Sequence, residues 1–467
     1  MASRRRTSFF AKLAIFSFAL ILALLLLSQS PPQGLTEPGR NALAIFVLCL
    51  ALWVTNLIPL AATSLLAIVL IPLLGIMEPG RAFSFFGNQA VFFLMGVFML
   101  TAAMIRTGLS KRIALLFLER FDRSPRFLLF GILLTCTFFA LWMPEHAVAA
   151  MMFPIVLEVS LQLNLRPLKS EYGKALFLSL AWGAIIGGVG TFLGGARAPL
   201  AVGLLREAYG LNIGFLTWVK AAIPVVILMV PLAWLALSIF FRIDIADVKR
   251  ASLFLRTELE RIGTMSAQEK RMGLLILCTI LCWITLGNYI GLAEISVLAA
   301  VLLFVLKIVR WAEIEDYVNW GVVVMYGGAI AIGKALTETK AIEDLLINYL
   351  PFGQLPVYAV LVLLAIISIL LTEAISNTAA VAVLIPLGFG IANKFGISPI
   401  LMVFAITIPA GLPFCLPMGS PPNAISFSAG YYSISQVARK GMFLNLAAIL
   451  VLMLVMKLYW PLIGLIY

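Results

Sequence analysis

Histidine and charged side chains are scarce in this sequence of 467 residues. It contains a single histidine, His146, and only 12% of its residues are charged. A soluble domain carries about 25% charged residues, so this composition excludes an ordinary soluble protein. One histidine also leaves few ways to build a metal centre or a histidine-dependent active site.

Recognisable catalytic and metal-binding motifs are missing as well. The absence of Gly-x-Ser-x-Gly and His-Glu-x-x-His patterns argues against an intramembrane enzyme that would use His146 with a serine. All five cysteines lie in apolar segments, and Cys278 and Cys282 are one helical turn apart. That spacing indicates packing within a helix rather than a metal site. We therefore expect no enzyme activity and no cofactor beyond a coupling ion.

Apolar residues are what the sequence has in excess, at 63% of the chain. Apolar runs of about 20 residues, the length that a bilayer-spanning helix requires, recur along the whole sequence. Backbone groups in lipid must be satisfied internally, and the period-2 alternation of barrel strands is not apparent. The predicted fold class is an all-α polytopic membrane protein in the lipid bilayer.

The net charge of +12 does not indicate nucleic-acid binding. Most Lys and Arg residues lie in short connections between apolar runs, in agreement with the positive-inside rule. The stretch MASRRRTSFF precedes an apolar run that is long for a signal peptide and lacks a clear cleavage site. We expect a multi-pass protein of the plasma or inner membrane, with its N-terminus in the cytoplasm and its C-terminus outside.

Several apolar runs are too long for one crossing and are interrupted in the middle. Residues 127–161 contain the triplet PEH at 144–146, and residues 357–389 contain SNT at 376–378. Each run fits a re-entrant hairpin that enters and leaves on one side. Residues 175–205 and 400–429 contain GGVGTFLGGARAP and PAGLPFCLPMGSPPN, which indicate broken helices. Such backbone is tolerated at membrane depth only where protein buries it or a watery cavity hydrates it.

The order of these elements occurs twice along the chain. After an N-terminal helix and outer loop (residues 1–40), we expect a first repeat over 41–242 and a second over 273–467. An amphipathic cytoplasmic link over 243–272 joins them. An odd number of crossings in each repeat makes the two inverted. Inverted repeats with broken helices and a midplane site are typical of secondary transporters.

Two motifs resemble those of the divalent anion–sodium symporter family, whose members carry dicarboxylates, citrate or sulfate. They are SNTAA at 376–380 and GSPPNAI at 419–425, and the segment 60–76 is also similar to the family. The resemblance covers nearly the whole chain. It implies about eleven transmembrane helices in two inverted repeats, two re-entrant hairpins, two broken helices, a homodimer and elevator-type alternating access.

The residue types at these positions suit an anion and a cation. A hairpin tip and an unwound helix expose carbonyl oxygens for sodium, whereas half-helix N-termini present N–H groups to an anion. The plainer alternative is that SNT only caps the returning helix. The candidate substrate contacts are Asn377, Thr378, Pro422, Asn423, Glu145, His146 and Arg197, and the candidate sodium ligands are Ser376, Asn377, Gly419, Ala410 and Glu373.

The first half departs from the family pattern. Glu145, His146 and Arg197 stand where Ser-Asn-Thr and a Gly-Thr-Pro-Pro-Asn type of loop are usual. Intramembrane ionisable residues are costly and usually functional. One hypothesis is that Arg197 supplies permanently the charge of a first sodium ion, with Glu145 as its partner. The alternative is that Arg197 snorkels to the outer interface. For Glu373, a cation ligand and a structural carboxylate are both open.

The sequence predicts a cation-coupled carrier of a small divalent anion, such as succinate, malate or sulfate. Sodium, protons or both could drive it. The alternative is a cation/proton antiporter or arsenite-type carrier of related architecture, which would not need anion-binding donors at both half-sites. A channel is disfavoured because inverted repeats with hairpins favour alternating access.

Overall fold

The computed structural model describes residues 2–31, 35–343 and 356–465, and regular structure in these residues is helical throughout. By length and composition, seven of the described helices are long and apolar enough to cross a membrane. The predicted total of eleven crossings stays a prediction. The helices outside the hairpins and broken helices are α1 (Ala2–Ser28), α2 (Glu37–Thr55), α3 (Leu60–Leu73), α4 (Pro79–Ser84), α5 (Gln89–Arg106), α6 (Leu109–Glu119), α11 (Phe215–Phe240), α12 (Lys249–Ile262), α13 (Ala267–Thr285), α14 (Leu292–Val305), α15 (Trp320–Glu338) and α21 (Ile434–Leu454).

The two long interrupted runs each form a helical hairpin, as predicted. The first hairpin is α7 (Pro125–Ala140) with α8 (Glu145–Gln162), and the second is α17 (Val357–Ala374) with α18 (Asn377–Phe395). Both returning helices begin where local chemistry favours a start. Pro144 precedes α8, and the Ser376 hydroxyl caps α18 by accepting the N–H of Ala379 at 3.3 Å.

The two broken helices are also present. The first is α9 (Glu171–Gly188) with α10 (Arg197–Tyr209), and the second is α19 (Pro399–Thr407) with α20 (Pro421–Ser428). Residues 189–196 and 408–420 separate the halves, so both Gly/Pro-rich stretches interrupt helices as expected. Most of this irregular backbone is buried in protein, which meets the requirement for non-helical chain at membrane depth.

The hairpins open toward opposite ends of the first broken helix. At the start of α9, the Tyr172 hydroxyl donates to the carbonyl of Pro125, the first residue of α7, at 2.8 Å. At the end of α10, the Tyr209 hydroxyl donates to Asn393 Oδ1 near the end of α18, at 2.7 Å. The first contact lies at the start of α9 and the second at the end of α10, the two halves of one broken helix. The open ends of the hairpins therefore lie at opposite ends of the bundle. This arrangement is the one expected of inverted repeats.

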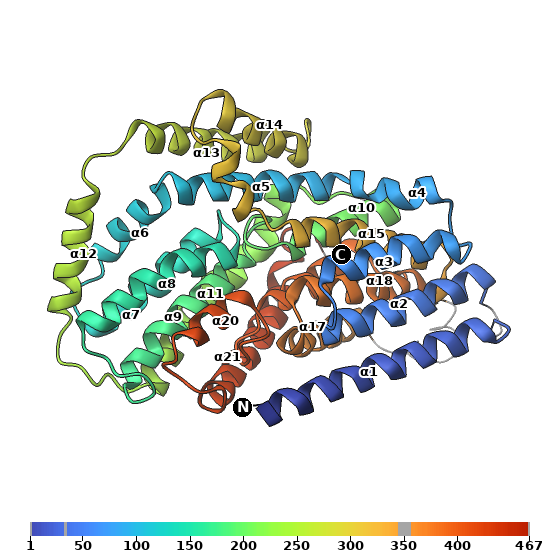
Figure 1. The fold of residues 1–467 in the computed structure, drawn as a ribbon, viewed down its shortest axis with the longest axis horizontal. Helices are drawn as coiled ribbons and strands as arrows, with labels where there is room; N and C mark the ends of the chain where they lie inside the picture. The colour runs from blue at the N-terminus through green and yellow to red at the C-terminus, as the bar shows by residue number, and fades with distance from the viewer. Residues whose placement is uncertain (1, 32–34, 344–355, 466–467) are drawn as a thin grey trace.

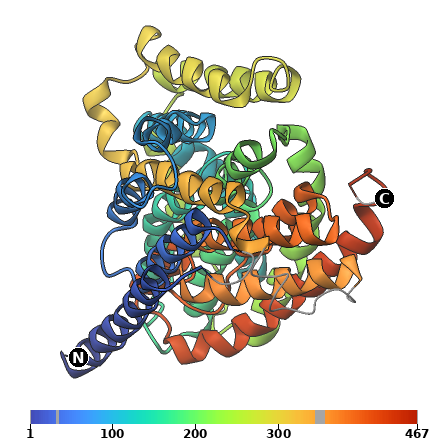
Figure 2. The same ribbon diagram turned by 90° about the vertical axis from the view of Figure 1, so that its right-hand side faces the viewer.

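The hairpins and broken helices pack against one another, and α11 and α21 pack on them; together these elements are called the central bundle. Figure 1 shows α13 and α14 along one edge and α1 along the opposite edge, with the hairpins and broken helices between them. Figure 2, turned by 90°, shows the same separation of α13 and α14 from the red and orange C-terminal elements. Close contact within the centre depends on small residues: a Cβ at Gly187 of α9 would overlap the carbonyl of Thr137 on α7.

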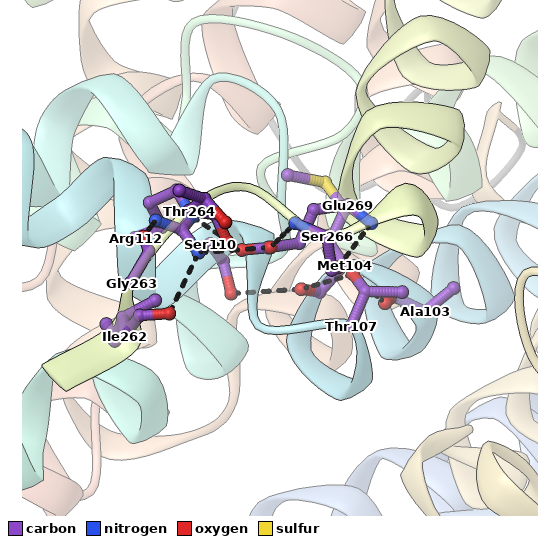
Figure 3. Close-up of polar contacts among 10 residues, drawn as sticks. All are labelled: Ala103, Met104, Thr107, Ser110, Arg112, Ile262, Gly263, Thr264, Ser266 and Glu269. Atoms are coloured by element: carbon purple, nitrogen blue, oxygen red, sulfur yellow. Dashed lines mark hydrogen bonds and ion pairs between the residues drawn. The ribbon is translucent and has the colours of Figure 1, made fainter.

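The predicted amphipathic link contains α12, which lies across one end of the bundle (Figure 1). A buried arginine on α6 fixes the turn between α12 and α13 (Figure 3). Arg112 Nε donates to Glu269 Oε1 at 2.7 Å and Nη2 to Oε2 at 3.1 Å, while Nη1 donates to the Gly263 carbonyl at 2.6 Å. The neighbouring guanidinium lowers the pKa of Glu269 to about 2.

Two details differ from the sequence analysis. Cys278 and Cys282 both lie in α13, as expected, but Cys278 is exposed on the helix surface and does not pack inside the protein. The apolar face of a helix that meets lipid needs no protein partner, which explains this exposure. The short helix α6 was also not expected, because its Lys111 and Arg112 resemble the charged residues of a connecting loop.

Candidate functional site

The two hairpin tips meet at one buried carboxylate. Glu145 is the first residue of α8, and Asn377 is the first residue of α18. Asn377 Nδ2 donates to Glu145 Oε1 at 3.0 Å, and Arg197 Nη1, at the start of α10, donates to Glu145 Oε2 at 3.1 Å. Three of the predicted substrate contacts, from three different elements, therefore meet at Glu145.

The Glu145–Arg197 pair is deeply buried. Only 4% of Glu145 and 2% of Arg197 is exposed, so Arg197 does not snorkel to an interface in this structure. Glycine makes room for the guanidinium, because a Cβ at Gly411 would overlap Arg197 Nε. Within the described residues, Arg197 Nη2 has no hydrogen-bond partner. An unpaired donor on a buried cation is costly, and the contacts within the protein do not explain this one.

A threonine joins the second hairpin tip to the second broken helix. Thr372 Oγ1 lies 2.7 Å from Asn377 Oδ1 and 2.9 Å from the carbonyl of Ala410. The hydroxyl has one proton and can donate to either oxygen at a time. This contact orients the Asn377 amide so that its NH₂ group faces Glu145. It also brings the Ala410 carbonyl, a predicted sodium ligand, beside the hairpin tip.

Glu373 holds the loop between the halves of the second broken helix. Its Oε1 accepts the N–H groups of Phe414 at 2.8 Å and Cys415 at 2.9 Å, and its Oε2 accepts the N–H of Leu416 at 2.9 Å. Asn445 Nδ2, on α21, donates to Oε1 at 2.7 Å. Four donors leave little free oxygen for a cation, so this geometry favours the structural role that the sequence analysis left open.

The second half-site consists of the tip of the second hairpin and the facing loop of the second broken helix. The remaining predicted ligands of this half-site lie along that loop and tip. Gly419 lies against hairpin 2, where a Cβ would come within 3.1 Å of the Thr372 carbonyl. Asn423 Nδ2 donates to the carbonyls of Pro413 at 2.9 Å and Leu416 at 3.2 Å, so its amide shapes the loop in this conformation. Ser376, Thr378 and Pro422 complete this half: Ser376 and Thr378 are half-buried at the tip, and Pro422 is buried in the first turn of α20.

His146 faces away from the Glu145–Arg197 pair. Its ring packs edge-to-face on Phe98 of α5, with ring centroids 5.9 Å apart. It also lines a cavity of about 270 Å³ that includes Thr101 of α5, Met151 of α8 and Tyr317. The cavity separates hairpin 1 from α5, so the structure places His146 at the boundary between the central bundle and its surroundings.

Sequence reasoning missed two residues that organise the site, Thr372 and Asn445. Both are polar side chains inside long apolar helices, and both are buried. The lone Asn445 within FLNLAAILV could have been found from the sequence, because a polar residue inside an apolar membrane helix usually has a functional or structural partner. Thr372 carries a weaker signal, because a threonine in an apolar helix can satisfy its hydroxyl on the preceding turn.

Comparisons with known proteins agree with this architecture. Residues 7–466 match the family model described as "Sodium:sulfate symporter transmembrane region". The sodium-dependent dicarboxylate transporter SdcS of Staphylococcus saprophyticus is 30% identical over 469 aligned residues, which cover 94% of this chain and 90% of SdcS. SdcS of Staphylococcus aureus strain USA300 is 28% identical, with 95% of this chain and 90% of SdcS covered.

Two solved structures share the fold at lower sequence identity. The Alcanivorax borkumensis YdaH transporter has a TM-score of 0.55 at 14% identity, with 81% of this chain and 88% of the other covered. Neisseria gonorrhoeae MtrF has a TM-score of 0.57 at 13% identity, with 95% and 98% covered. Because the family model spans nearly the whole sequence, this multi-pass membrane protein belongs to the sodium:sulfate symporter family of transporters, and it is not an enzyme.

Proposed function

We propose that this protein is a sodium-coupled symporter of small divalent anions, with dicarboxylates such as succinate or malate as the first candidates. The observation that carries the proposal is the meeting of both hairpin tips at Glu145, Asn377 and Arg197. An amide and a guanidinium that already hold one carboxylate are suited to hold another. The relatives' names, which specify sodium and dicarboxylate, support the same assignment.

In this proposal the sodium ion binds at the second half-site. Sodium prefers several oxygens at once, from carbonyls and from neutral side chains. The Ser376 hydroxyl and Asn377 Oδ1 lie on the hairpin tip, and Thr372 links Asn377 Oδ1 to the Ala410 carbonyl of the facing broken helix. Glu373 keeps this loop in shape through its four hydrogen bonds and adds a nearby negative charge. Gly419 allows the loop to lie directly against the tip.

The first half-site works differently, because Arg197 carries a fixed positive charge. Glu145 neutralises it in this structure and occupies both Asn377 Nδ2 and Arg197 Nη1. A substrate carboxylate therefore competes with Glu145 for these two donors, or joins it at the free Nη2 of Arg197. Protonation of Glu145 would weaken its hold on Arg197 and leave positive charge for the anion. This competition supplies a route by which protons act on transport together with sodium.

The proposed motion is an elevator movement of the central bundle, in a homodimer in the plasma membrane with the N-terminus inside. The hairpins open at opposite ends of the bundle, so each can cover the site from one side. His146 and Phe98 lie at the boundary that such a movement would cross. The cavity of about 270 Å³ beside them leaves room for rearrangement there.

Uptake into proteoliposomes tests this function. Labelled succinate, malate and sulfate should be offered separately, with a sodium gradient and a pH gradient imposed one at a time. We expect at least one dicarboxylate to accumulate with inward sodium, and Asn377→Ala to weaken the apparent affinities for anion and sodium together. Uptake that does not depend on the sodium gradient would contradict the proposal. So would an Asn377→Ala variant with unchanged apparent affinities for anion and sodium.

A further inference from the structure

A polar cavity lies far from the hairpin tips, between the start of α9 and the first turns of α21. Its volume is about 410 Å³, and its lining residues are Glu171, Lys174, Ser435, Gln436, Arg439 and Lys440. Tyr172, beside this cavity, bonds the start of α7, and Lys440 Nζ donates to the carbonyl of Phe240, the last residue of α11, at 2.7 Å. The cavity therefore lies at the end of the bundle where α7, α9 and α21 begin, which is the predicted cytoplasmic end.

Positive charge in this cavity exceeds negative charge. Lys174 forms an ion pair with Glu171, and Lys440 Nζ lies 3.9 Å from the same carboxylate. Lys440 also lies over the ring of Phe241, with Nζ 3.6 Å from the ring centroid. Arg439 is exposed, and no carboxylate of the described residues forms an ion pair with it. Lys174 and Lys440 share one carboxylate and Arg439 pairs with none of the described residues, so the cavity is suited to an additional anion.

The outer surface of α21 leads from this cavity along an apolar stripe. Phe443, Leu446 and Leu450 are exposed and follow Arg439 at intervals of four, three and four residues, which places all four on one face of the helix. Phe443 is 64% exposed and Leu450 is 64% exposed. A basic group at the end of a lipid-facing apolar stripe is the arrangement that holds a phospholipid, with the head group at the cation and the acyl chains along the stripe.

We propose that this cavity binds the phosphate of an anionic phospholipid from the inner leaflet, with Lys174, Arg439 and Lys440 as its contacts. Free phosphate offers the same chemistry, but it would not use the apolar stripe. Because the cavity belongs to α9 and α21 of the central bundle, a bound lipid would attach to the part of the protein that carries the transport site. The proposal does not depend on which anion is transported.

Native mass spectrometry of the purified full-length protein with added phosphatidylglycerol tests the site directly. We expect Arg439→Gln to weaken phosphatidylglycerol binding by about fivefold or more, the effect of one basic residue near an anionic surface. Phosphatidylcholine binding should not change. The matched control is Lys249→Gln, because Lys249 is an exposed cation on α12 at the same end but outside the cavity. Equal losses in both variants would show only general surface charge and would overturn the proposal.

A second pair of measurements separates lipid from free phosphate. Phe443→Gln, on the apolar stripe, should weaken phosphatidylglycerol binding and leave inorganic phosphate binding unchanged. If inorganic phosphate binds as tightly as the lipid and Phe443→Gln has no effect, the cavity is a site for free anions and the lipid proposal is wrong. Unchanged melting temperatures of the variants in detergent would confirm that each is folded.

Discussion

Single and double replacements of the buried pair Glu145 and Arg197 can distinguish its contribution to stability from its contribution to transport. Replacement of Arg197 by Met removes the cation and leaves the Glu145 carboxylate buried, with the Asn377 amide as its remaining partner. Removal of one partner from a buried ion pair costs about 3–5 kcal/mol, because the other charge is left uncompensated. We therefore expect the free energy of unfolding of Arg197→Met to fall by about this amount.

The double variant Glu145→Gln/Arg197→Met removes both charges. A buried pair replaced on both sides is often nearly neutral for stability, so we expect most of the lost free energy to return. Transport should not return, because the cation that we propose binds the anion is still missing. The wild type, the two single variants and the double variant form a double-mutant cycle, whose coupling energy measures the interaction between Glu145 and Arg197.

Equilibrium unfolding in mixed micelles and uptake in proteoliposomes are the two assays. Arg112→Met is the matched control, since Arg112 forms another buried pair, with Glu269, far from the hairpin tips. It should lose stability and keep the apparent affinity for the anion. An Arg197→Met variant that is as stable as the wild type, or a double variant that transports normally, would contradict these expectations.

Three further predictions follow from other contacts of the structure. Asn377→Ala, which removes a hydrogen bond to a charged group worth about 1.5–3 kcal/mol, should weaken the apparent affinities for anion and sodium about tenfold or more in uptake assays. Asn445→Ala should lower the free energy of unfolding by about 1–3 kcal/mol, because Glu373 loses a donor at 2.7 Å. The folded-state pKa of Glu269 is lowered, from 4.5 to about 2, so its contribution to stability is complete above about pH 4.5 and is lost toward pH 2. Melting curves of wild type and Arg112→Met should therefore differ equally at pH 7 and pH 5.5, and converge only in stronger acid.

The hairpins and broken helices could be predicted from sequence because their signals are local. A polar triplet or a Gly/Pro-rich stretch inside a run too long for one crossing leaves few alternatives in a bilayer. The start of α18 at Asn377 and the break before Arg197 follow from such signals. The exposure of Cys278 could not be predicted, because a lipid-facing helix is apolar on all sides and shows no periodicity that separates protein from lipid.

The pairing inside the site was only partly predictable. The Glu145–Arg197 pair was proposed from the cost of isolated intramembrane charges. The hydrogen bond from Asn377, in the other repeat, to the same carboxylate could not be predicted. The two residues are 232 positions apart and meet only through the packing of the whole bundle. The direction of His146 toward Phe98 depends on the same packing. Three of the four donors around Glu373 are backbone N–H groups. Almost every residue has such a group, so the sequence does not show which ones contact Glu373.

The number of sodium ions bound per protein tests whether Arg197 takes the place of a first sodium ion. Equilibrium binding of radioactive sodium to the purified protein, with a saturating dicarboxylate present, measures this number. We expect one ion, bound at the second half-site, because in the proposed function Arg197 supplies the positive charge of a first sodium ion. Two or more ions that bind cooperatively, together with an Arg197→Met variant that binds the same number, would contradict this expectation.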